Sequence, residues 1–385
     1  GWSLSGSGHG YRWSVPVRVD PPDRQNPVAR PVGAAGRLEG MFSRQKSLVG
    51  LDIGTDEVKV VELTETAEGL ELTGFGWGRI PTPEETLDTV KAVLRESGIR
   101  TRKVATAVSG RSVVVRYITL PQLDDDELPG TLRLEADKYI PFDRDEVCID
   151  GQSLEVASDG SQESAEMKSL LVAVKKDLLQ DHIDQVQDLG LIPVVIDVDS
   201  FALGNSFELR NEAGVRSEDP DRAVALVDVG ASKTNIHILR GNVSCFSREI
   251  YLGGTDLTES IARREHLDEA EAEELKCDPL GNEELVANAV QPVLDEIAGE
   301  IQLSFEYFEN QFDHRVEEVF ISGGASRTIG LQDTFERVFD REVKTWDPLE
   351  SIKIREDLVD VDALAEHKVQ LSIAVGLGSR LQDCV

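Results

Sequence analysis

Two short segments of the chain carry the same arrangement of an acidic residue and a glycine. Asp52-Ile-Gly54 follows the apolar residues 48–51, and Asp228-Val-Gly230 follows the apolar residues 224–227. A glycine at the end of a strand lets backbone N–H groups approach a phosphate, and a neighbouring aspartate can hold a water of a phosphate-bound Mg²⁺. The spacing therefore predicts two related turns that clamp a nucleotide, with Asp52 and Asp228 on the metal side.

Lys59 stands on the strand that follows the first turn. Because this strand begins at the turn, it can return a cation to the phosphates, although a solvent-facing Lys59 is the open alternative. Asp56 and Glu57 lie where a phosphate-binding turn favours Ser or Gly. We expect both to point outward, because inward they would repel a phosphate.

Further candidates lie beyond the two turns. The apolar residues 319–321 lead to Gly323-Gly324, a third glycine turn. Glu273 and Lys276 share one face of an expected helix, where they could meet an adenosine or form a plain surface ion pair. Asp199 follows the apolar residues 192–196. It could orient a water that attacks a phosphate, or it could cap the helix expected at 200–207.

Composition narrows the class of protein. The chain of 385 residues favours two domains, and its net charge of -32 argues against a nucleic acid or an anionic membrane as the partner. The four cysteines are widely spaced, which is typical of reduced cytosolic thiols without a zinc site. No Gly-x-x-x-x-Gly-Lys-Ser/Thr motif occurs, which excludes the P-loop class of NTPases.

The elements that must position these residues form a repeating pattern. Residues 1–40 lack periodicity and are expected to be a disordered extension or translated upstream sequence. Strands and helices then alternate, with a first domain over 41–200, an inserted lobe at about 81–195 and a second domain over 201–385. The repeat of 176 positions (228 minus 52) predicts a duplicated α/β fold around a nucleotide cleft. An amphipathic helix is expected at 292–312, and Pro129-Gly130 is expected to break the helix before Tyr139.

With these motifs the chain resembles the actin, heat-shock chaperone and sugar kinase superfamily, and within its FtsA-like branch the PilM family of type IV pilus assembly. The most specific segments are residues 51–63, 135–142, 198–203 and 253–258. The resemblance implies ATP with Mg²⁺ in the cleft, Asp52 and Asp228 near the metal, and Asp199 in place of a longer water-orienting Glu, so that hydrolysis is slow at most. It also implies nucleotide contacts from Asp52, Gly54, Thr55, Lys59, Asp228, Gly230, Ser232, Thr234, Glu273, Lys276, Gly323, Gly324 and Ser326.

The resemblance further implies a cytoplasmic adaptor. Such a protein binds the N-terminal peptide of a PilN-type inner-membrane protein, is held at the inner membrane through that partner, and couples its nucleotide state to the pilus machinery. Two alternatives remain, a filament-forming division protein of the FtsA type and a phosphotransferase of the sugar kinase type. The residues 371–377 are expected to be buried packing, unlike the membrane-binding helix that ends many FtsA-type proteins, and no polar substrate cluster supports the phosphotransferase.

Overall fold

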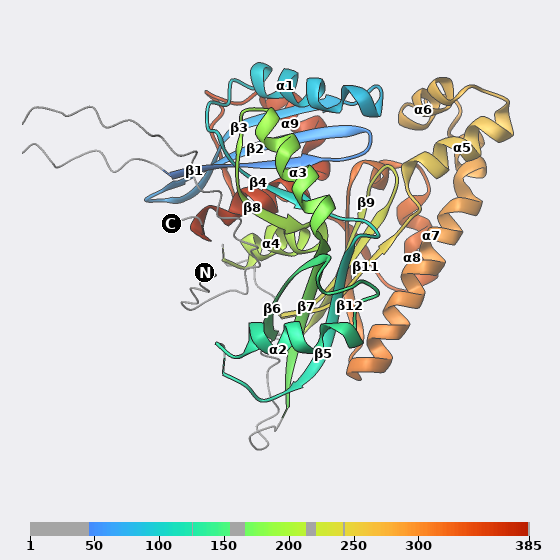
Figure 1. Ribbon diagram of the computed structural model, residues 1–385. Coiled ribbons are helices and arrows are strands. Elements are labelled where there is room, and N and C mark those ends of the chain that lie inside the picture. Colours follow the sequence, from blue (N-terminus) through green and yellow to red (C-terminus); the bar gives the residue numbers. More distant parts are fainter. Residues whose placement is uncertain (1–45, 125, 155–165, 213–220, 242, 384–385) are drawn as a thin grey trace, which may run out of the picture.

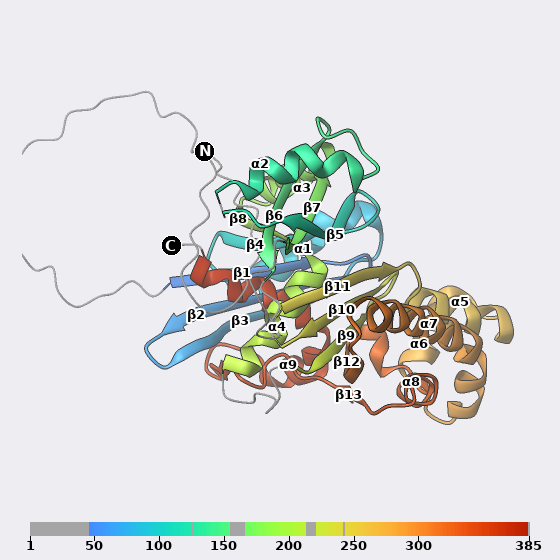
Figure 2. The same ribbon diagram turned by 90° about the horizontal axis from the view of Figure 1, so that it is seen from below.

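The described residues form two large sheets and one small sheet, with helices packed on them (Figures 1 and 2). The computed structural model describes residues 46–124, 126–154, 166–212, 221–241 and 243–383. The predicted disordered extension, 1–40, lies outside the described residues. In Figure 2 the small sheet lies above the first large sheet, whose opening strands are blue, and the second large sheet lies to the right, with its first three strands in olive.

The first large sheet has the strand order β14-β3-β2-β1-β4-β8. Strands β1, β2 and β3 pair antiparallel, whereas β4 and β8 continue the sheet in parallel from β1. The register places Asp52 opposite Lys59, so both side chains lie on one face of the sheet. The strands are β1 (Lys46–Ile53), β2 (Glu57–Thr66), β3 (Gly69–Arg79), β4 (Lys103–Val108), β8 (Ile192–Val198) and β14 (Lys353–Ile354).

The second large sheet repeats this arrangement. Its strand order is β11-β10-β9-β12-β13. Strands β9, β10 and β11 pair antiparallel, whereas β12 and β13 continue the sheet in parallel from β9. The repeat confirms the predicted duplication of an α/β fold. The strands are β9 (Ala223–Val229), β10 (Thr234–Arg240), β11 (Val243–Ile250), β12 (Val316–Ser322) and β13 (Val343–Thr345).

The small sheet forms the inserted lobe. It contains β5 (Val113–Pro121), β6 (Val147–Leu154) and β7 (Glu166–Lys175), in the order β5-β7-β6, and α2 (Leu128–Glu135) packs on it. The lobe is narrower than the predicted 81–195, because β4 and β8 are members of the first large sheet. Most of their apolar residues are buried, as is typical of parallel strands covered on both faces. Pro129 does not break α2, because it occupies the first turn, where no intrahelical N–H bond is lost.

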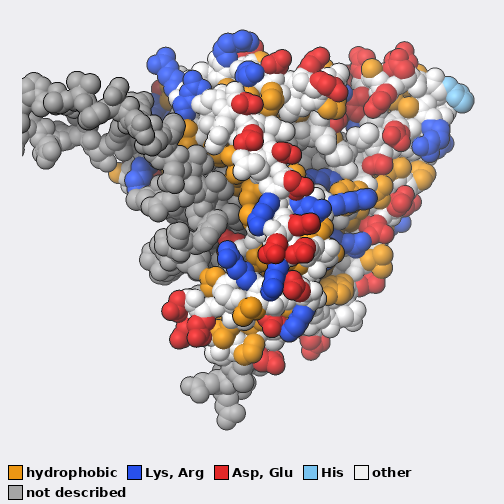
Figure 3. Space-filling view, in the orientation of Figure 1, with side chains coloured by type: hydrophobic (Ala, Val, Ile, Leu, Met, Phe, Trp, Pro, Cys, Tyr) orange, Lys and Arg blue, Asp and Glu red, His pale blue; other side chains and the backbone are white. Residues whose placement is uncertain are grey.

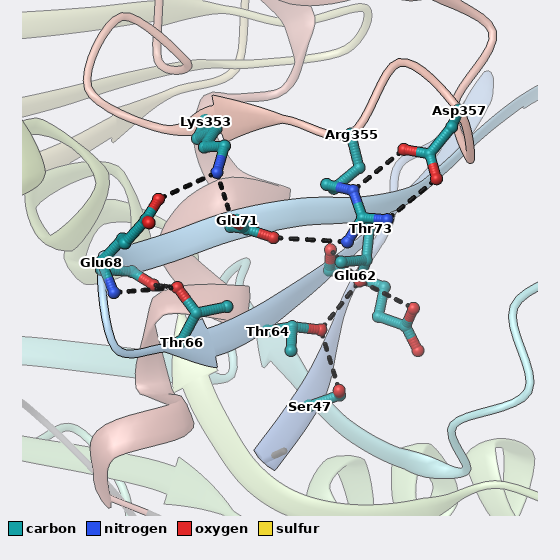
Figure 4. A network of polar contacts seen from close by, with 11 residues as sticks. Ser47, Glu62, Thr64, Thr66, Glu68, Glu71, Thr73, Lys353, Arg355 and Asp357 are labelled. Atoms are coloured by element: carbon teal, nitrogen blue, oxygen red, sulfur yellow. Dashed lines mark hydrogen bonds and ion pairs between the residues drawn. The ribbon is translucent and has the colours of Figure 1, made fainter.

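The end of the chain returns to the first sheet, which corrects the predicted assignment of all of 201–385 to the second domain. β14 pairs with β3, and Lys353 and Arg355 lie beside the buried Glu71 of β3, at N–O distances of 2.9 and 3.6 Å (Figure 4). Helix α10 (Ser372–Gly378) packs against both β1 and α4 (Asp199–Glu212). All seven residues of α10 are buried, as predicted for 371–377.

Helices cover the outer faces of the large sheets. In the second domain α5, α7 and α8 share one apolar core with β9, β10 and β12, while in the first domain α1 and α3 pack on the sheet. Helix α4 contacts strands of both large sheets and so lies at their junction. The helices not bounded above are α1 (Thr86–Glu96), α3 (Lys176–Asp188), α5 (Gly254–Glu265), α6 (Glu269–Cys277), α7 (Glu283–Phe312), α8 (Leu331–Phe339) and α9 (Val361–His367), with short 3₁₀ turns η1 (Pro83–Glu85), η2 (Ala136–Lys138), η3 (Gly324–Arg327), η4 (Lys368–Gln370) and η5 (Ser379–Asp383).

Helix α7 is longer than predicted, because Pro292 lies inside it rather than at its start. A proline in a helix leaves the carbonyl four residues earlier without its usual donor. Here that carbonyl belongs to Asn288, and the Arg264 guanidinium donates a hydrogen bond to it at 2.5 Å. A contact from a neighbouring helix therefore allows α7 to run through the proline.

Acidic and basic side chains are interspersed on the face shown in Figure 3. Acidic groups gather at the upper right and lower left of that view, and basic groups lie at its upper left and near its centre. None of the helices in the described ranges combines the length and the apolar composition that crossing a bilayer needs.

Candidate functional site

The two Asp-x-Gly turns have the same hydrogen bonding and meet each other. Gly54 N–H donates to the Glu57 carbonyl at 2.9 Å, and Gly230 N–H donates to the Lys233 carbonyl at 2.9 Å. The Thr55 hydroxyl of the first turn donates to Ser232 Oγ of the second at 3.2 Å. Two segments separated by 177 positions in the sequence therefore face each other across the space between the domains.

The two aspartates stand at the ends of β1 and β9, behind these turns. Asp228 Oδ1 accepts hydrogen bonds from Ser322 at 2.8 Å and from Ser372 at 3.1 Å. Burial raises the pKa of Asp52 to about 6, against the opposing charge of Lys59, and the Asp228 charge adds to the increase. Burial also raises the pKa of Asp228. The charge of Asp228 thus contributes to the electrostatic environment of Asp52.

Lys59 points into the site. Its Nζ lies 3.8 Å from Asp52 Oδ2 and 3.2 Å from Glu57 Oε2, and its side chain is only 13% exposed. Burial lowers the pKa of Lys59, but the two carboxylates outweigh burial and raise it. The solvent-facing alternative for Lys59 is therefore wrong. The expectation that Glu57 points outward is also wrong, because Glu57 supplies a second counter-charge to the lysine.

Asp199 is the first residue of α4, and its carboxylate binds Lys233. The Lys233 Nζ donates to Asp199 Oδ2 at 2.7 Å and to Glu249 Oε1 at 3.2 Å. Burial opposes the charge on this lysine, but Asp199 and Glu249 raise its pKa. The water-orienting role of Asp199 stays a prediction, and the structure adds that an ammonium group already holds one of its oxygens.

Lys233 and Glu249 are members of the site that the sequence reasoning did not single out. The register offers the missing signal: Asp228 lies opposite Asn235 on β10, and Asn235 lies opposite Glu249 on β11. Residues paired in this way share one face of the sheet. Pairing the strand after each turn with the next strand would therefore have placed Glu249 on the same face of the sheet as Asp228, two strands away.

Helices α5 and α6 bring the expected adenosine-side residues to the second turn. Gly254 N–H, at the start of α5, donates to the Gly230 carbonyl at 2.9 Å. Lys276 Nζ of α6 donates to the Gly254 carbonyl at 3.0 Å and to Glu273 Oε2 at 2.6 Å. Glu273 and Lys276 thus share a helix face, as predicted, and they border the turn instead of forming a distant surface pair.

The third glycine turn, Gly323-Gly324, lies next to the second Asp-x-Gly turn. Gly323 has a φ of 90°, and a Cβ on it would lie 2.4 Å from the Val229 carbonyl oxygen, so only glycine fits there. A Cβ on Gly254 would lie 3.3 Å from Ala325 Cβ. Beside this turn is a polar hollow of about 360 Å³, lined by Ser326, Arg327, Thr328, Gly330, Gln332, Asp333 and Thr345.

Two predicted contact residues have their hydroxyl groups engaged within the second domain. Thr234 is buried and donates to the Leu252 carbonyl at 2.8 Å, ahead of α5. Ser326 donates to the Gly323 carbonyl at 2.6 Å and so supports the third turn. In this structure both hydroxyls hold loops of the site in place, while Thr55, Ser232, Lys59 and the glycines border the space between the domains.

Comparisons with known proteins agree with this geometry. The family model described as "Type IV pilus assembly protein PilM" matches residues 50–382. The chain is also 22% identical over 256 residues to the cell division protein FtsA of Bacillus subtilis (strain 168), across 59% of this chain and 57% of FtsA, so the match spans little more than half of that protein.

Solved structures are similar over most of their length. A structure of the "PilM-PilN type IV pilus biogenesis complex" superposes with a TM-score of 0.76 and 28% identity, across 87% of this chain and 98% of that one. The ethanolamine utilization protein EutJ from Carboxydothermus hydrogenoformans has a TM-score of 0.51 and 15% identity, across 88% and 90% of the two chains, and shows the shared fold only. The chain thus has the actin-like fold that the sequence predicts, and it belongs to the family of type IV pilus assembly proteins described as PilM.

Proposed function

We propose that this chain is an ATP-binding adaptor of type IV pilus assembly. The observation that carries the nucleotide part is the meeting of the two turns through Thr55 and Ser232, with Asp52 and Asp228 behind them. Because the Gly54 and Gly230 N–H groups close the two turns, the other backbone N–H groups of the turns are the ones that would face a polyphosphate from two sides. We expect an adenosine to extend from those phosphates toward Gly323 and Lys276, because both lie next to the second turn.

The charges of the site fit a divalent cation. Among the described residues, five carboxylates, those of Asp52, Glu57, Asp199, Asp228 and Glu249, lie around Lys59 and Lys233. Carboxylate oxygens are hard ligands of the kind that Mg²⁺ prefers, usually with several waters retained. Asp52 and Asp228 would hold the hydrated ion, which would neutralise phosphate charge.

Turnover is expected to be slow or absent. A residue that orients the attacking water must be able to turn a carboxylate oxygen toward that water. Asp199 Oδ2 is held by Lys233 at 2.7 Å. The shorter side chain of Asp, compared with Glu, also leaves this carboxylate further from the phosphates.

The adaptor part of the proposal rests on family membership. The similar solved structure is of a PilM–PilN complex, and the superposition covers nearly all of that chain. We therefore infer that this chain binds the N-terminal peptide of a PilN-type inner-membrane protein. It would be cytoplasmic and held at the inner membrane through that partner, with the nucleotide state coupled to the pilus machinery.

Calorimetry tests both parts on the full chain. ATP–Mg²⁺ is titrated first, and then a synthetic peptide with the N-terminal sequence of the PilN-type protein from the same source. Saturable heat in both titrations supports the proposal, and a peptide affinity that changes with nucleotide supports coupling. Peptide binding without any nucleotide binding would leave a static adaptor, and no binding in either titration would overturn the proposal.

The FtsA relationship supplies the second candidate, a filament-forming division protein. One feature of the structure weighs against direct membrane attachment by α10: every residue of that helix is buried against α4 and β1. Co-sedimentation of the full chain with anionic vesicles, with no partner present, separates the two functions. Binding to vesicles under those conditions would favour the FtsA-type function.

A further inference from the structure

One carboxylate joins the second phosphate turn to the inserted lobe. Glu249, near the end of β11, accepts a hydrogen bond from Lys233 Nζ at 3.2 Å. The same carboxylate accepts from the Gly110 N–H at 3.0 Å through Oε2 and at 3.2 Å through Oε1. Tyr251 OH donates to its Oε2 at 3.2 Å. Glu249 therefore contacts both the site and a segment 139 positions earlier in the chain.

Gly110 lies at the entrance to the lobe. It stands between β4, a strand of the first large sheet, and β5, the first strand of the lobe, and has a φ of 93°. Such a backbone conformation is readily adopted by glycine and suits a bend where the chain passes from one sheet to another. A bond to the Gly110 N–H thus acts at the connection that sets the direction of the lobe.

Two further contacts hold the lobe against the second domain on the same side. The Tyr117 hydroxyl of β5 and Ser244 Oγ of β11 are 2.6 Å apart. The Arg111 guanidinium lies 5.1 Å from the centre of the Tyr251 ring, within the range of a cation–π contact. Figure 2 shows β5 and β11 next to each other. The lobe therefore rests on β11, and Glu249 is the contact that also reaches the phosphate turn.

We propose that Glu249 transmits the occupancy of the phosphate site to the lobe. The proposal rests on the proposed binding of ATP in the cleft. A bound polyphosphate attracts Lys233 and so removes a counter-charge from Glu249. It also repels the Glu249 carboxylate toward Gly110. A carboxylate with fewer cationic partners binds its remaining N–H donor more tightly. Both effects strengthen the hydrogen bond from the Gly110 N–H to Glu249. Nucleotide binding therefore holds the entrance to the lobe more firmly.

Hydrogen–deuterium exchange of the full chain tests the relay. The readout is the exchange of residues 109–113, measured without ligand and with saturating ATP–Mg²⁺, while calorimetry establishes binding for each protein. In the native chain ATP–Mg²⁺ should slow this exchange several-fold. Glu249→Ala should speed it about tenfold without ligand, as expected for a lost charge-assisted hydrogen bond, and should abolish the response to nucleotide.

Two other variants complete the design. Glu249→Gln keeps an acceptor oxygen but has no charge, so residues 109–113 should stay protected while their response to nucleotide disappears. Glu300→Ala removes an exposed partner of Arg248, also on β11, and should respond to nucleotide as the native chain does. If the native chain binds ATP and the exchange does not change, or if both Glu249 variants respond as the native chain does, the relay is wrong while ATP binding stands. If the native chain does not bind ATP, the proposed function and the relay both fail.

Discussion

Asp52 is a carboxylate that the fold makes unfavourable to ionise. Its ordinary pKa is 3.8, and burial raises it to about 6 in the folded chain. The folded state therefore binds a proton more readily than the unfolded state between these values. It follows that the contribution of Asp52 to stability falls as the pH rises from about 4 to about 6, and is constant above that range. A bound cation would recover this loss, which is typical of a residue kept for binding rather than for stability.

Asp52→Asn should raise stability and weaken nucleotide binding. Because the change in pKa is about two units, the variant should be more stable than the native chain at pH 7.5 by about 3 kcal/mol, with no difference at pH 4. Its affinity for ATP–Mg²⁺ should fall at least about tenfold, which is about 1.4 kcal/mol. Urea unfolding at both pH values and calorimetry measure these effects. Asp56→Asn, in the same turn, is the control and should change neither. A less stable Asp52→Asn at pH 7.5 would contradict the account.

Among the elements, β14 shows how the end of the chain is fastened to the first sheet. Figure 4 shows Lys353 between Glu68 and Glu71, and Arg355 between Glu71 and Asp357. Hydrogen bonding from Lys353 lowers the pKa of Glu71 below its ordinary value of 4.5. The pKa of Glu71 is therefore shifted in the opposite direction to the pKa of Asp52. Stability from Glu71 is present at neutral pH and is lost as the pH falls through the lowered pKa.

Glu71→Gln should therefore lower the melting temperature at pH 7, and the difference from the native chain should shrink as the pH falls below about 4. Glu68→Gln is the matched control, because Glu68 binds the same lysine but its side chain is 76% exposed, against 9% for Glu71. An exposed ion pair contributes little, so this control should show the smaller change. Thermal unfolding followed by circular dichroism measures both. If the two variants lower the melting temperature equally, burial of Glu71 is not the reason for its contribution to stability.

Helix α10 depends on glycines where it meets its neighbours. A Cβ on Gly376 would lie 1.7 Å from the Ala202 carbonyl oxygen of α4. Gly376→Ala should therefore force α10 and α4 apart and cost about 1–3 kcal/mol or more. Gly299→Ala in α7 is the control. A Cβ there has no atom within 4 Å, so this variant should gain about 0.5–1 kcal/mol from helix propensity. Denaturant unfolding compares them, and a Gly376→Ala chain as stable as the native one would contradict the packing.

For the molecule as a whole, the space between the two Asp-x-Gly turns is where the phosphates should enter. Thr55 and Ser232 approach each other there at 3.2 Å. A covalent link between them would close this space. The double variant Thr55→Cys and Ser232→Cys, made with Cys277→Ser because Cys277 is exposed, should lose ATP–Mg²⁺ binding when oxidised and recover it when reduced.

Calorimetry before and after reduction measures the effect, and a mass spectrum confirms the cross-link. Each single cysteine variant serves as a control and should bind equally in both redox states. An oxidised, cross-linked chain that still binds ATP would show that the nucleotide does not lie between these turns.

Local sequence patterns determined much of the fold and of the candidate site. The two Asp-x-Gly turns, the strands before and after them and the duplicated order follow from turn chemistry and from the repeat of apolar residues, both of which act over a few positions. Asp52, Lys59, Asp228 and the glycine turns could therefore be placed from sequence, as could the shared face of Glu273 and Lys276.

Only the tertiary structure decided the contacts between distant segments. Arg264 lets α7 pass through Pro292, β14 and α10 return to the first domain, and Lys233 and Glu249 join the site to the lobe. Each of these depends on partners brought together by the packing of whole sheets and helices. A hydrogen bond between Gly110 and Glu249 has no local signal, because the residues are 139 positions apart and neither is unusual in its own segment.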